Sequence, residues 1–63
     1  MDFADMLCAG PVYVHRHQGQ YRCVWTPLGT NREILGHGIG IAATPYIAIS
    51  RAQTDAKAQG ITP

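Results

Sequence analysis

The sequence predicts an α+β fold in which a three-stranded antiparallel sheet packs against one C-terminal helix. Two short alternating runs, VYVHRH and QYRCVW, flank a Gln-Gly pair, which is the pattern of a β-hairpin. The last third of the chain combines a helix start signal, good helix formers and a terminal glycine. A strand–strand–strand–helix order gives one layer of sheet beneath one helix.

The length and composition fit one small domain with little charge. A chain of 63 residues buries only about 60% of its unfolded surface. Hydrophobic residues make up 46% of the sequence, as in an ordinary globular protein, so we expect no disorder through its middle. Five basic against four acidic residues give a net charge of +1, so long-range attraction to nucleic acid or anionic membranes is weak. We expect the domain to span residues 12–63, preceded by a partly ordered segment, residues 1–11.

The first two expected strands are residues 12–17 and 20–25, joined by Gln18 and Gly19. Successive side chains of a strand point to opposite faces of the sheet, so one set of residues faces the core and the other faces solvent. The expected core face holds Val12, Val14, Arg16, Tyr21, Cys23 and Trp25, and the expected solvent face holds Tyr13, His15, His17, Gln20, Arg22 and Val24.

A third strand is expected over residues 32–41, REILGHGIGI. Its residues Gly36, Gly38 and Gly40 lie on one face with Ile34, and this row leaves a shallow groove for a helix or another backbone. The opposite face of this strand carries Leu35, His37, Ile39 and Ile41.

The closing helix is expected to have Thr44 as its N-cap, Pro45 in its first turn and Gly60 as its stop. Its packed side should be a narrow stripe of small residues that suits a helix lying close against a sheet. That stripe consists of Ile49, Ala52 and Ala56, helped by Ala48 and Tyr46.

We expect neither a metal site nor an enzyme, and no cofactor. The pair His15 and His17 shares a face, but Cys23 points to the other face, and zinc needs three or four converging ligands. Neither cysteine has the glycine-rich elbow or orienting third group of a nucleophile site. The sequence GHGIG lacks the helix opening of a phosphate-binding loop. The two cysteines are expected to pack as small hydrophobic side chains.

The expected location is cytoplasmic and reducing. The start, MDFADMLCAG, lacks the basic flank and long apolar core of a signal peptide. The longest apolar run, GIGIAATPYIAI, contains a proline and is too short to span a bilayer. We therefore expect both cysteines to be free thiols and the protein not to associate with a membrane.

The solvent face of the hairpin is the candidate functional surface. A two-stranded ribbon fits the major groove of DNA, where amide and guanidinium groups pair with base edges. Gln20 and Arg22 are the expected base readers, while His15, His17 and Arg32 are expected to contact phosphates or the groove. Polar residues that only keep an open sheet face in water are the competing interpretation.

Three short stretches, YRCVWTP, ILGHG and ATPYIAISRAQTDAKAQGITP, resemble the amino-terminal arm-binding domains of tyrosine-family phage integrases. The closing QGITP is similar to the Gly-Ile-Asp-Pro that often ends the helix in that family. The resemblance covers about residues 12–63. It implies a three-stranded sheet on one helix, and a sheet that lies in the major groove of double-stranded DNA. By position it implicates Tyr13, His15, His17, Gln20, Arg22 and Arg32. The family's core-binding and catalytic domains have no counterpart in these residues, so a relative of this kind would be a detached DNA-binding module without enzymatic activity, a small regulator, or the same fold reused for another partner.

Two further hypotheses remain open. The first is a protein-binding module, such as a small phage-type inhibitor or adaptor, that acts through the sheet face or an edge strand and could form a homodimer. The second is a pH response, because protonation of all three histidines would raise the net charge from +1 toward +4. An electrophoretic shift at low salt, beside a size measurement of the protein alone, separates DNA binding from protein binding.

Overall fold

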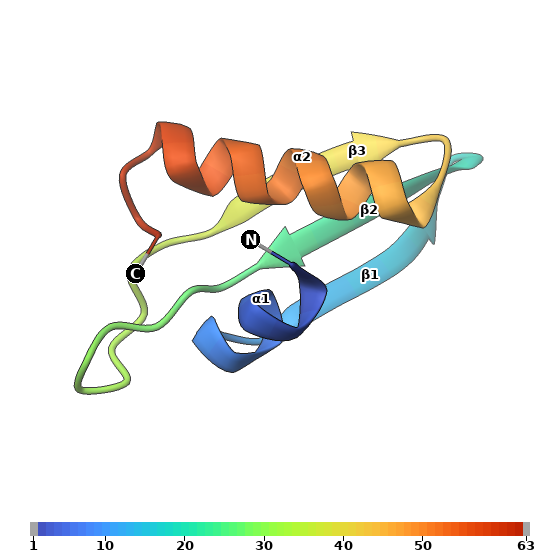
Figure 1. Ribbon diagram of the computed structural model, residues 1–63. Coiled ribbons are helices and arrows are strands. Elements are labelled where there is room, and N and C mark those ends of the chain that lie inside the picture. The colour runs from blue at the N-terminus through green and yellow to red at the C-terminus, as the bar shows by residue number, and fades with distance from the viewer. Residues whose placement is uncertain (1, 63) are drawn as a thin grey trace.

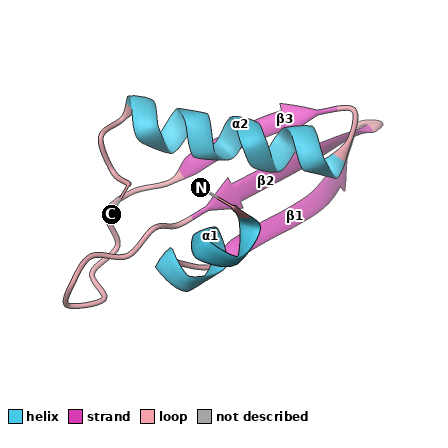
Figure 2. Ribbon diagram, viewed as in Figure 1, coloured by secondary structure: helices cyan, strands magenta, loops and turns pink. Residues whose placement is uncertain are grey.

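The predicted α+β class is confirmed by the computed structural model, which describes residues 2–62 (Figure 1). The elements run α1 (Phe3–Ala9), β1 (Val12–His17), β2 (Gln20–Trp25), β3 (Gly38–Ala42) and α2 (Pro45–Ala58). The strands form one antiparallel sheet in the order β1-β2-β3. Both helices lie on the same side of this sheet (Figure 2). Neither helix of the described chain has the length and apolar character that crossing a bilayer requires.

The β1–β2 hairpin has the predicted strands and register. His17 lies opposite Gln20, and Val12 lies opposite Trp25. Gln18 has φ 51° and Gly19 has φ 78°, and positive φ at both loop positions is the signature of a type I′ turn, whose twist matches that of the strands. The turn therefore fixes which side chains face the helices.

The third strand is shorter than predicted, because it begins at Gly38 and not near Arg32. Pro27 has no N–H to donate to a ladder, so regular pairing stops after β2. Arg32 has φ 62°, in the left-handed region that no strand residue occupies. The N–H of Gly29 donates to the Glu33 carbonyl at 2.8 Å and closes a tight turn. The expectation that Arg32 extends the sheet face is therefore wrong.

Helix α2 has the predicted cap and, in part, the predicted stripe. The Thr44 hydroxyl accepts from the Ile47 N–H at 3.3 Å, Pro45 begins the helix, and Gly60 follows it with φ 71°. The buried residues of the helix are Ala48, Ala52 and Ala56. Tyr46 is 84% exposed, so its predicted place in the stripe is wrong: two residues before Ala48 is about 200° around the helix.

The alanine stripe lies directly on the glycines of β3. A Cβ atom built on Gly40 would collide with the Ala48 carbonyl oxygen, and one on Gly38 would collide with that of Ala52. The obstructing atoms are main chain and cannot move aside. The predicted groove of small residues is thus where the helix and the sheet approach each other.

Helix α1 completes the core from the other end of the sheet. The Asp2 carboxylate caps it by accepting from the Asp5 N–H at 2.9 Å. The Met6 side chain is fully buried, and the Met6 carbonyl accepts from Trp25 Nε1 at 3.1 Å. Gln53 of α2 donates to the Met6 sulfur at 3.2 Å. The buried hydrophobic core comprises Met6, Cys23, Trp25, Ala42, Ala48, Ala52 and Ala56.

Candidate recognition surface on the open sheet face

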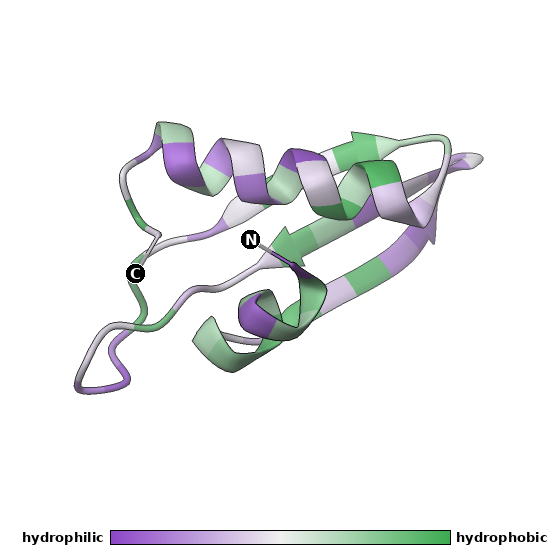
Figure 3. Cartoon of the chain, viewed as in Figure 1, coloured by the Kyte–Doolittle hydropathy of each residue, from purple (hydrophilic) through white to green (hydrophobic). Residues whose placement is uncertain are grey.

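The side of the sheet away from both helices carries a mixed polar and apolar surface, which we call the open face. Three rows of cross-strand neighbours compose it: Tyr13–Val24–Ile39, His15–Arg22–Ile41 and His17–Gln20. On this face the row Tyr13–Val24–Ile39 is largely apolar, and the row beside the turn, His17–Gln20, is polar. The hydropathy of β1 as a whole falls in the same direction, toward the turn (Figure 3). The open face therefore has an apolar end and a polar end.

The structure brings together five of the six residues singled out from the sequence: Tyr13, His15, His17, Gln20 and Arg22. Two further members, Ile39 and Ile41, are 39% and 46% exposed. The strand alternation places both isoleucines opposite the glycines that meet α2. The sequence pattern already places both isoleucines on the face opposite the glycines, but it does not single them out as members of the candidate surface.

Three rings follow one another along the outer strand of the open face. The Tyr13 and His15 ring centroids are 5.1 Å apart, and those of His15 and His17 are 6.1 Å apart. Residues two apart on a strand share a face, which explains the row. Tyr13 is 63% exposed, so the row is available to a partner at its apolar end.

Arg22 and His15, which are direct neighbours across the strands, have unused hydrogen-bonding groups. Arg22 Nε and His15 Nδ1 are shut off from solvent and have no partner among the described residues. A shielded polar group without a partner costs about 1–3 kcal/mol. A ligand that supplied hydrogen-bonding partners to these two side chains would remove this cost.

The open face contains no carboxylate among the described residues. Asp2 and Asp5 belong to the start of α1, Glu33 to the loop before β3, and Asp55 to α2. Arg22 is consequently the one permanently charged group on this face within residues 2–62. The surface attracts acceptors and anions at one point, without forming a broad basic patch.

His37 lies just beyond the open face. Its Nδ1 atom is 3.0 Å from the Thr26 hydroxyl, one position outside the β2–β3 pairing. It does not join the row of His15 and His17. The three histidines of the sequence are therefore two neighbours and one separate side chain.

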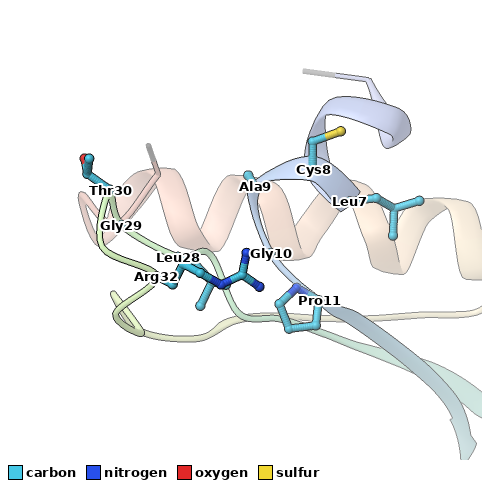
Figure 4. A pocket seen from close by; sticks show the side chains of 9 residues that line it. All are labelled: Leu7, Cys8, Ala9, Gly10, Pro11, Leu28, Gly29, Thr30 and Arg32. Atoms are coloured by element: carbon cyan, nitrogen blue, oxygen red, sulfur yellow. The ribbon is translucent and has the colours of Figure 1, made fainter.

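Arg32, the sixth predicted residue, lines a depression of about 470 Å³ between the end of α1 and the loop before β3 (Figure 4). Its guanidinium lies beside Gly10 and Pro11 in that view. The depression is lined by Leu7, Cys8, Ala9, Gly10, Pro11, Leu28, Gly29, Thr30 and Arg32. Arg32 thus belongs to a different part of the surface from the open face.

The cysteines and histidines do not converge. Cys23 is buried between sheet and helices, on the opposite face from His15, and burial raises the pKa of its thiol. Cys8 is exposed on α1, so the expectation that both cysteines pack as small hydrophobic side chains is wrong for Cys8. No group of three or more His, Cys, Asp or Glu side chains within residues 2–62 is placed to hold a metal ion.

In comparisons with known proteins, no protein family, curated protein or solved structure matches the chain.

Proposed function

We propose that this protein is a small, non-enzymatic DNA-binding module that lays its open face along the major groove. The observation that carries the proposal is the Arg22 side chain, whose Nε has no hydrogen-bond partner among residues 2–62, on a face without carboxylates in that range and beside His15, His17 and Gln20. Arginine pairs with guanine edges and glutamine with adenine edges, while histidine reaches phosphates. Arg32 has no role in the proposal because it lies off this face.

The scarcity of cations sets the strength of this binding. Each neutralised phosphate contributes about one unit to the slope of log affinity against log salt. Arg22 is joined on the open face only by imidazoles, so we expect a slope below about 3 for one molecule. Binding should therefore be measured at low ionic strength, for example 20 mM NaCl.

The test is fluorescence anisotropy with a labelled random 20-base-pair duplex and two variants that lose the same charge. Arg22→Ala should weaken binding at least about fivefold, because a base-edge contact contributes roughly 1–3 kcal/mol. Lys57→Ala, in the exposed last turn of α2 on the other side of the sheet, should change affinity less than twofold. Equal losses in both variants, or no binding by the wild type, would contradict the proposal.

A second candidate is a protein-docking surface, favoured by the exposure of Tyr13, Ile39 and Ile41. Aromatic and aliphatic side chains ringed by polar groups are typical of interface centres. If this is the function, the wild type gives no shift with duplex DNA at low salt. Replacing Ile41 with serine would then abolish capture of the protein partner while leaving the fold intact.

A further inference from the structure

The two edges of the sheet differ in whether side chains hydrogen-bond to their outward main-chain groups. On the outer edge of β3, the Ile39 N–H donates to Asp55 Oδ2 at 2.8 Å. On the same edge, the Ile41 carbonyl accepts from Arg51 Nη1 at 2.7 Å. Gln59 Nε2 also donates to Asp55 Oδ2, at 2.9 Å, which holds the carboxylate in place. Side chains of α2 and its C-cap therefore occupy part of the pairing capacity of this edge.

The outer edge of β1 has no such cover. The main-chain N–H and C=O groups of Ile39 and Ile41 point outward from β3. Because inward and outward groups alternate along antiparallel strands, the register across the sheet makes the N–H and C=O groups of Val12, Val14 and Arg16 point outward from β1. Among residues 2–62, nothing hydrogen-bonds to the outward N–H and C=O groups of these three residues. An unpaired edge of this kind is a template for another strand.

We propose that β1 pairs antiparallel with β1 of a second copy of this chain, about a two-fold axis at Val14. In such pairing, outward residues must lie opposite outward residues. An axis at Val14 puts Val14 opposite itself and Val12 opposite Arg16 of the second copy, which gives about six main-chain hydrogen bonds. Shifting the strands by two residues in either direction leaves only about four, so this register is the best one available.

The side chains of β1 support self-pairing in this register. On the helix side, Val14 meets Val14, and Arg16 meets Val12, so no like charges lie opposite each other. On the open side, Tyr13 meets His15, a ring pair that already lies at 5.1 Å within one chain. In the joined sheet, the helix side therefore remains mainly apolar across the contact between the two copies, and the open side remains a row of rings.

The closure of the assembly follows from the covered β3 edge. With one pairing edge open and the other partly occupied, two copies complete each other and do not grow into a fibre. The result is a six-stranded sheet that carries all helices on one side and two adjoining open faces on the other. This inference does not depend on DNA binding, and no DNA is used in its test.

The test is sedimentation equilibrium of the wild type and two proline variants. Val14→Pro removes an outward N–H at the centre of the proposed contact, and proline is tolerated on an edge strand where its N–H would face solvent. Ile41→Pro removes an outward, unbonded N–H on the β3 edge and is the matched control. We expect a dimer of 6.8 kDa chains for the wild type and Ile41→Pro, and at least a tenfold weaker dimer for Val14→Pro.

Amide hydrogen exchange of the wild type keeps the test decisive if a proline variant fails to fold. The amides of Val12, Val14 and Arg16 should be protected in concentrated solution and lose protection on dilution. A wild type that stays monomeric at millimolar concentration, with fast exchange at these three amides, would overturn the proposal. So would a dimer that Ile41→Pro dissolves and Val14→Pro leaves intact.

Discussion

Gly40 shows how one missing side chain fixes the distance between sheet and helix. A Cβ there meets the Ala48 carbonyl oxygen, so the helix cannot remain in place if a methyl group is added. We expect Gly40→Ala to destabilise the protein by about 3 kcal/mol, the upper end for overpacked cores, because main chain must move. Urea unfolding followed by circular dichroism measures this loss.

Gly19→Ala provides the comparison at the same scale. Gly19 has φ +78° and open space around it, so the same substitution meets no atom and costs only backbone strain. That strain is about 1–2 kcal/mol for an L-residue in the left-handed region. A cost for Gly40→Ala no larger than that for Gly19→Ala would mean that α2 lies farther from the sheet than described.

Single residues also show where sequence reasoning was sufficient and where it was not. Alternation placed Tyr13, His15, His17, Gln20 and Arg22 on one face, because the period of a strand is two whatever the residues are. Alternation says nothing about where a strand ends. Arg32 lies outside its predicted strand because the turn around it holds its backbone in the left-handed region. Arginine seldom adopts that conformation, so its presence in the sequence gives no sign of it.

At the scale of elements, helix α1 is the part that the sequence described least. The sequence predicts only a partly ordered segment over residues 1–11, whereas the structure has seven helical residues there with a fully buried Met6. A short helix is unstable alone, so its formation depends on docking to the sheet and to α2. Tertiary contact of this kind has no local signal in the sequence.

Met6→Ala tests whether α1 is part of the cooperative unit. Removing a fully buried methionine side chain should destabilise the protein by about 2–5 kcal/mol. Leu7→Ala, on the half-exposed side of the same helix, should cost less than about 1 kcal/mol. Thermal unfolding of both variants measures the difference, and equal effects would indicate that α1 is detached in solution.

At the scale of the whole molecule, the structure is a slab of 36 × 21 × 17 Å with both helices on one side. The α+β class follows from the sequence because helix and strand signals are both strong and strictly ordered along the chain. The bareness of the opposite side follows too, since one helix can cover only one face.

Global stability should fall in alkaline solution because of Cys23. Burial raises the pKa of this thiol in the folded state above its unfolded value of about 8.5. The stabilisation is complete below the unfolded pKa and is lost as pH rises toward the folded one, by about 1.4 kcal/mol per pH unit. Urea unfolding at pH 7 and pH 10 should show this loss in the wild type.

Two variants isolate the contribution of the buried thiol. Cys23→Ala should lose less stability between pH 7 and pH 10 than the wild type, because the buried thiol with the raised pKa is then absent. Cys8→Ala should keep the full dependence, since Cys8 is exposed. Identical pH profiles for all three proteins would show that Cys23 is accessible to solvent in the native state.

The hydrogen bond from Trp25 to the Met6 carbonyl gives the molecule its own optical probe. Trp25 is the single tryptophan of the chain, and its indole lies where the sheet meets α1. Detachment of that helix would bring water to the ring and shift its fluorescence emission to longer wavelength, even if the hairpin and α2 stayed folded. Tryptophan fluorescence can thus follow local detachment of α1 in the unlabelled protein, separately from the loss of secondary structure in the rest of the molecule.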